Sequence, residues 1–78
     1  MSPEARAVRV ALGVNTRRTA DQLRRETGLC YEAIELALAE LERCLAIYTP
    51  PVRLRRTSVP PYGFIFDQWE IVPVATAP

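Results

Sequence analysis

Arginine provides every basic side chain of this chain: all ten Lys and Arg residues are Arg, set against nine acidic residues. Clustered arginines can attract the phosphates of a nucleic-acid backbone, or they can simply keep a small lysine-free domain soluble. Residues 5–25 hold six arginines and one aspartate, and residues 52–57 hold three arginines and no acid. The clustered arginines that are candidates for phosphate contact are Arg17, Arg18, Arg24, Arg25, Arg53, Arg55 and Arg56.

The segment between these basic regions is acidic, with four glutamates and one arginine in residues 30–43. Leucine and isoleucine recur there at helical spacing, which predicts a helix with Ile34, Leu38, Leu41 and Leu45 facing inward. The positions left facing outward are Tyr31, Glu32, Glu35, Leu36, Ala39, Glu40, Glu42 and Arg43.

This outward face has three interpretations. Glutamate favours helix formation, so the face can simply be solvated. It can contact a protein with a basic surface, with Leu36, Ala39 and Tyr31 as the apolar part of the contact. It can also face bases, because a glutamate accepts a hydrogen bond from cytosine N4, although several acids together repel the phosphate backbone. The residues expected to serve base recognition or protein contact are Tyr31, Glu32, Glu35, Leu36, Ala39 and Arg43.

Catalytic chemistry has few candidates in this sequence. There is no histidine and no glycine-rich phosphate loop, and the two aspartates, Asp21 and Asp67, are isolated from each other. We therefore expect no enzyme activity, no cofactor and no metal. Cys30 and Cys44 on one helix would lie about 21 Å apart, too far for a disulfide. We expect them to be buried free thiols in a reducing compartment.

Length and composition indicate one globular domain. The chain has 78 residues, of which 49% are hydrophobic and 24% charged, with a formal net charge of +1. No apolar run approaches the roughly 20 residues that span a bilayer, so we expect a cytoplasmic protein without a membrane partner. Residues 1–73 are expected to form the domain, and residues 74–78 a disordered tail.

The elements that position these side chains can be predicted from local signals. Ser2-Pro3-Glu4 is typical of a helix start, and the apolar spacing predicts a helix over about 3–13. Thr19 and Gln22 match a capping box at the start of a second helix over about 20–27, which Gly28 ends. The third helix is expected over about 31–47.

The pattern changes to a period of two after the third helix. Residues 52–55 alternate and residues 64–72 are rich in aromatic and β-branched side chains, which predicts a two-stranded hairpin with its turn at 57–63. Trp69 and the phenylalanines are expected to pack inside, whereas Tyr62 at the turn is expected to be exposed.

Three helices followed by a hairpin, with the segments TADQLRRETGL (19–29) and AIELALAELERCLAIY (33–48), resemble the winged helix-turn-helix family over residues 3–73. The resemblance implies an α+β, mainly α, domain with a C-terminal β-hairpin wing. It also implies binding of double-stranded DNA, with the third helix in the major groove and the wing arginines on phosphate or minor groove. One departure is Cys30, where the family usually has a better helix cap.

Two functions follow from this resemblance, of which DNA binding is the expected one and protein binding the alternative. The first is a small stand-alone transcriptional regulator of bacterial or phage origin that binds DNA, plausibly as a homodimer because one module offers little contact area. The second is a winged helix used for protein–protein interaction, such as a phage factor that binds a host protein through the acidic third helix. The glutamates of that helix favour the second function, and the clustered arginines favour the first.

Overall fold

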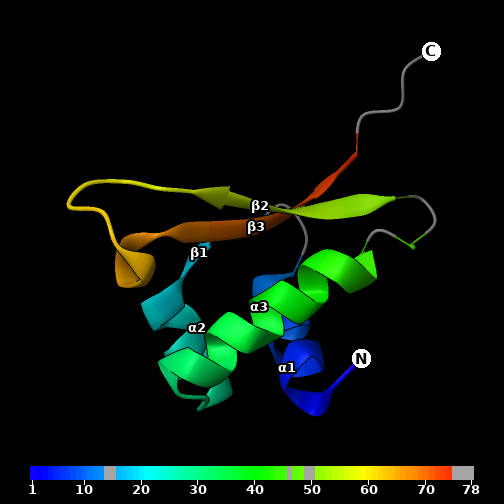
Figure 1. Cartoon of the computed structure of the whole chain (residues 1–78), viewed down its shortest axis with the longest axis horizontal. Helices are drawn as coiled ribbons and strands as arrows, with labels where there is room; N and C mark the ends of the chain where they lie inside the picture. The colour runs from blue at the N-terminus through cyan, green and yellow to red at the C-terminus, as the bar shows by residue number, and fades with distance from the viewer. Residues whose placement is uncertain (14–15, 46, 49–50, 75–78) are drawn as a thin grey trace.

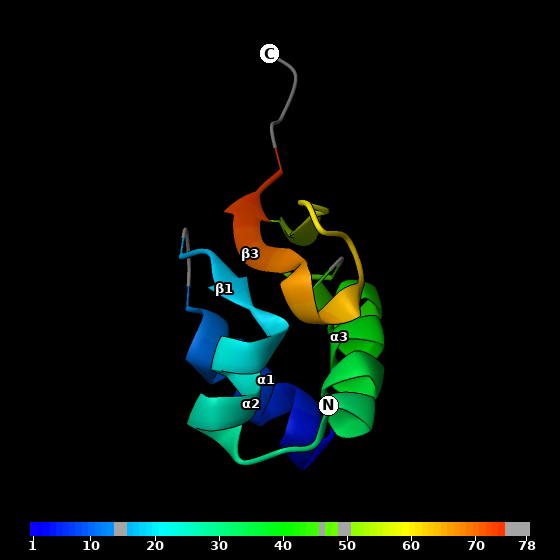
Figure 2. The ribbon, with the colours of Figure 1, turned by 90° about the vertical axis from the view of Figure 1, so that its left-hand side faces the viewer.

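The computed structural model describes residues 1–13, 16–45, 47–48 and 51–74. Three helices lie on one side of a small antiparallel sheet whose strand order is β1-β3-β2 (Figures 1 and 2). This confirms the predicted α+β class with three helices, and the layout is compatible with a winged helix. The elements are α1 (Pro3–Leu12), β1 (Arg18–Thr19), α2 (Ala20–Thr27), α3 (Tyr31–Leu45), β2 (Val52–Thr57), the 3-10 turn η1 (Phe64–Phe66) and β3 (Gln68–Pro73).

The caps predicted for the first two helices are present. The Ser2 hydroxyl accepts a hydrogen bond from the Ala5 N–H at 3.1 Å, which satisfies one of the free donors at the start of α1. Thr19 and Gln22 bond reciprocally at 3.1 and 2.9 Å, as a capping box requires. Gly28 ends α2 with a left-handed φ of 74°. The short connection that follows brings α3 across the first two helices.

Within the described part of the chain, helix α3 supplies five of the eleven buried residues of the core cluster, more than any other element. Ile34, Leu38, Leu41 and Leu45 are all buried, as their spacing predicted, and Ala37 is buried beside them. The described helix ends at Leu45, so the predicted end at about residue 47 was too late. Ile47 lies in a turn, in which its N–H donates to the Cys44 carbonyl. Ala46 lies outside the described residues. Side chains from α1, α2 and β3 complete the core: Ala5, Val8, Leu12, Leu23, Trp69 and Ile71.

The predicted hairpin is present but differs in two ways. Residues 64–66 form a 3-10 turn rather than strand, held by bonds from the Phe66 N–H to Gly63 O (3.0 Å) and from the Asp67 N–H to Phe64 O (3.2 Å). This turn lets Phe64 pack on the core while Asp67 turns inward. The second difference is β1, an unpredicted strand of two residues that pairs with β3. We call residues 52–73 the wing. Of the predicted tail, residues 75–78 lie outside the described residues.

The register of β2 and β3 separates the two faces of the sheet. Leu54 pairs with Ile71, and both pack on the helices, whereas Arg55 pairs with Glu70 on the opposite face. Since side chains alternate along a strand, Arg53 also lies on that outer face. Helices cover only the inner face in both views of the ribbon (Figures 1 and 2). The outer face is therefore open to solvent.

A hydrogen bond between Ser2 and Glu40 joins the start of α1 to α3, and its contribution to stability should depend on pH. The Ser2 backbone N–H donates to Glu40 Oε2 at 2.6 Å, and this bond, with a second one from the Ser2 side chain, lowers the pKa of Glu40 below its ordinary 4.5. A lowered folded-state pKa adds stability above the unfolded pKa, and that stability is lost as the pH falls through the folded-state pKa.

Replacing Glu40 with glutamine is therefore expected to lower the melting temperature slightly at pH 7. The difference from the wild type should shrink as the pH drops below 4.5. Thermal melts of both proteins from pH 7 to pH 3 measure this. A difference that stays constant over that range would show that the charge of Glu40 is not what stabilises the contact.

Candidate interaction face of helix α3 and the wing

The arginines of α2 are held by acids of the same helix. Arg24 and Arg25 both contact Asp21, at 3.4 and 3.0 Å, and the Arg24 guanidinium also lies over the Tyr31 ring, 5.4 Å from its centroid. The Tyr31 hydrogen bond and the Asp21 carboxylate raise the pKa of Arg24. Arg18, just before α2, pairs with Glu26 at 3.4 Å. Arg18, Arg24 and Arg25 therefore each have an acidic neighbour on α2.

The outer face of the sheet carries three further predicted arginines. Arg17 and Arg55 share Glu70, at 3.7 and 3.5 Å, while Arg53 is exposed and makes no ion pair with any of the described residues. Arg17 also donates to Gln68 Oε1 at 3.3 Å. Three arginines against one glutamate leave this face with two net positive charges.

Arg56 differs from its neighbours on β2. Its Nε donates to Asp67 Oδ2 at 2.7 Å, its Nη2 contacts the same oxygen, and its guanidinium lies 5.1 Å from the centroid of the Trp69 ring. Asp67 is only 1% exposed, so this carboxylate depends on Arg56 for its charge partner. Arg56 thus has a structural role that its place among the clustered arginines did not indicate.

The outward residues of α3 do not form one surface. Tyr31 is half-buried: its hydroxyl donates to Asp21 Oδ1 at 3.1 Å, and its ring meets the Phe64 ring edge-on with centroids 6.3 Å apart. Leu36, 73% exposed, lies on the side of α3 next to the start of α1, where it shares a hollow with Ser2 and Glu40. The expected apolar patch of Leu36, Ala39 and Tyr31 is therefore divided between two sides of the helix.

The side of α3 that faces the wing is acidic. Glu32, Glu35 and Glu42 are exposed, and we call these three residues the acidic face. Glu35 and Glu42, together with the exposed Ala39, line a groove of about 420 Å³ between α3 and the wing. Its other lining residues are Leu38, Leu54, Arg56, Phe64 and Trp69.

Sequence reasoning did not anticipate this groove. The sequence does contain two patterns that belong to it: Glu35 and Glu42 are two helical turns apart, and Leu54 and Trp69 occupy inward strand positions. The sequence does not give the distance between the helix and the strands, and this distance creates the groove. The wing tip adds exposed apolar side chains beyond the predicted Tyr62, namely Ile65 and Phe66. Phe66 was expected to pack inside, and the 3-10 turn instead directs it outward.

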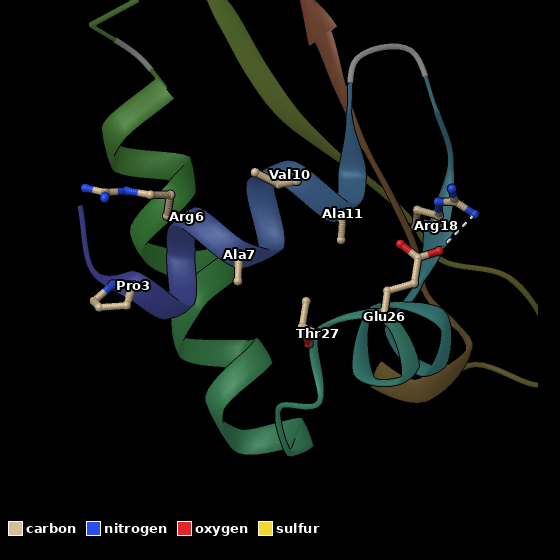
Figure 3. A pocket seen from close by; sticks show the side chains of 8 residues that line it. All are labelled: Pro3, Arg6, Ala7, Val10, Ala11, Arg18, Glu26 and Thr27. Carbon is tan, nitrogen blue, oxygen red and sulfur yellow. Dashed lines mark ion pairs between the residues drawn. The ribbon is translucent and has the colours of Figure 1, made fainter.

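A larger hollow of about 710 Å³ lies between α1 and α2. Figure 3 shows the small and apolar side chains of α1, among them Ala7, Val10 and Ala11, on one side of it, and the Arg18–Glu26 ion pair on the other. Glu26 is the one carboxylate among the residues that line the hollow, and the one hydroxyl, that of Thr27, donates to the Leu23 carbonyl at 2.6 Å.

The remaining reactive side chains are dispersed. Among the described residues, no group of three His, Cys, Asp or Glu side chains could hold a metal ion. Cys30 is exposed and Cys44 half-buried, so the expectation of two buried thiols was wrong, because Cys30 lies in the turn ahead of α3 rather than on its inner side. Within the described part of the chain, no helix is both long and apolar enough to cross a membrane.

No protein-family model matches this chain, and no curated protein and no solved structure is significantly similar to it.

Proposed function

We propose that this protein is a winged-helix interaction module that binds another protein through α3 and the wing, in the cytoplasm of a bacterium. The observation that carries the proposal is the acidic face. Glu35 and Glu42 line the groove between α3 and the wing, and Glu32 is exposed on the same helix, the element that a DNA-binding winged helix presents to the major groove. Phosphates flank every base edge, so three carboxylates there oppose entry into the groove.

The placement of the arginines supports the same function. Those beside α2 are matched by Asp21 and Glu26, and Arg56 is matched by Asp67. Exposed ion pairs are weak, roughly 0–1 kcal/mol, so they do not lock the side chains in place. The acids nevertheless reduce the positive potential on both sides of α3, and potential is what attracts phosphate.

The chemistry of the acidic face defines the class of partner. Three exposed carboxylates beside an apolar groove match a surface with arginine or lysine side chains set among apolar residues. Electrostatic attraction of this kind speeds association and orients the partner, while the apolar contacts determine how long the complex lasts.

Affinity capture from a bacterial lysate tests the proposal with two matched variants. In the first, Glu32, Glu35 and Glu42 all become glutamine; in the second, Arg53 and Arg55 become glutamine. We expect a captured protein to be lost with the first variant and retained with the second, since only the first removes the acidic face. A protein captured equally by all three forms, or lost only with the arginine variant, would contradict the proposal.

DNA binding is the second candidate, and the outer face of the sheet favours it. Arg17 and Arg55 both pair with Glu70 there, and Arg53 on the same face makes no ion pair with the described residues. In this alternative the protein acts as a transcriptional regulator, and its arginines hold phosphates next to the wing. Replacing Arg53 and Arg55 with glutamate should then abolish duplex binding, whereas replacing Glu32 with glutamine should preserve it.

A further inference from the structure

We propose that the groove between α3 and the wing receives a basic segment of the partner protein, with the aliphatic part of an arginine or lysine on the groove floor and its cation between Glu35 and Glu42. This inference rests on the proposed protein-binding function and names the chemistry of the segment that is bound. Two features of the groove carry it: its apolar floor and its acidic wall.

The floor is apolar and large enough for side chains. Leu38 from α3, Leu54 from β2, and the rings of Phe64 and Trp69 line a volume of about 420 Å³. Arginine and lysine side chains lie with their methylene stems on apolar surface and keep the charged end at its edge. A floor of this kind with charges at its rim therefore fits these two residue types better than it fits a small anion or a nucleotide.

The acidic wall is formed by α3 alone. Glu35 and Glu42 are seven residues apart on the helix, so they lie on the same side about 10.5 Å apart along the axis. On the opposite wall, Arg56 is the one cation among the lining residues, and Asp67 already binds its guanidinium. An incoming cation thus meets two carboxylates and a guanidinium whose charge is balanced.

The Trp69 ring belongs to the apolar floor rather than to a polar contact. Trp69 lines the groove and is only 7% exposed. Its Nε1 atom is buried and has no hydrogen-bond acceptor among the described residues, so a segment in the groove contacts the ring and not the indole N–H.

Trp69 is also the single tryptophan of the chain, so its fluorescence reports on the groove directly. The probe is a capped peptide of alternating leucine and arginine, and its counterpart has glutamate in place of arginine. We expect the basic peptide to shift Trp69 emission in a saturable way, and the acidic peptide to leave it unchanged. Replacing both Glu35 and Glu42 with glutamine should weaken binding about tenfold, the sum of two modest ion pairs.

Glu4→Gln is the control, because it removes a carboxylate from an exposed position on α1 that neither lines the groove nor belongs to the acidic face. It should leave peptide affinity nearly unchanged, and thermal melts should show that all variants are folded. No emission change with the basic peptide, equal binding of the acidic peptide, or an equal loss with Glu4→Gln would overturn the groove proposal. None of these results removes the protein-binding function, which is contradicted when lysate capture is equal in all three forms or depends only on the arginines.

Discussion

Replacing Arg56 with leucine is expected to lower the free energy of unfolding by about 2–3 kcal/mol, because it leaves the buried Asp67 carboxylate without its cation. Breaking a fully buried ion pair has larger effects, but the Arg56 side chain is 54% exposed and solvent screens part of the interaction. The substitution also removes the guanidinium from the face of Trp69. Urea unfolding followed by Trp69 fluorescence measures the change.

Arg55→Leu is the matched control for this prediction. Arg55 is the preceding residue of the same strand and contacts Glu70 only at 3.5 Å on the open face, so its loss should change stability by less than about 0.5 kcal/mol. In an Asp67→Asn background, Arg56→Leu should have a much smaller effect, since no buried charge is then left unpaired. Equal effects of the two arginine substitutions would show that Asp67 does not depend on Arg56.

Replacing Leu41 with alanine is expected to destabilise the protein by about 3 kcal/mol. Leu41 is fully buried in the middle of α3, where the helix contacts the rest of the core, and truncation leaves a cavity in addition to the lost apolar burial. Domains have only roughly 5–15 kcal/mol of stability in total, so this is a large fraction for a chain of this length. Thermal and urea melts should both show it.

Leu36→Ala on the same helix provides the comparison. Leu36 is 73% exposed, so the same truncation there should change stability by less than about 0.5 kcal/mol. Nearly equal effects at the two positions would mean that the inward stripe of α3 is not the centre of the core.

The helices could be predicted from sequence because their signals are local. Thr19 and Gln22 define a capping box within one turn, Gly28 supplies the left-handed residue that ends α2, and the stripe from Ile34 to Leu45 repeats along a single helix. None of these signals depends on the rest of the fold. The order of the three helices followed from these signals, and the change to a period of two after the third helix indicated the hairpin.

The details of the wing depend on contacts between distant residues, and they were missed for that reason. Strand β1 has two residues and no pattern of its own; it exists because Arg18 and Thr19 pair with the edge of β3. Residues 64–66 have strand-forming side chains, yet they form a 3-10 turn that places Phe64 on the core and Asp67 next to Arg56. Propensity alone does not contain those tertiary contacts.

The candidate site was predictable in part. The exposed glutamates of α3 follow from the helical period, and the exposure of Tyr62 from its place in the turn. The partners of the arginines did not follow, because Glu70 lies in β3, whose register is set only in the folded sheet, and Asp67 is placed by the 3-10 turn just before that strand. Tyr31 was assigned to the outward face, but its hydroxyl reaches Asp21 on α2.

The most direct test of a protein-binding rather than a DNA-binding face is a fluorescence-anisotropy titration of the wild-type protein with a random-sequence duplex at two salt concentrations. With the acidic face beside the wing, we expect no binding stronger than a dissociation constant of about 10⁻⁴ M at physiological salt, and little gain when the salt is lowered. Tighter binding that weakens steeply as salt is added would mean that the arginines make several phosphate contacts, and it would contradict the proposed function.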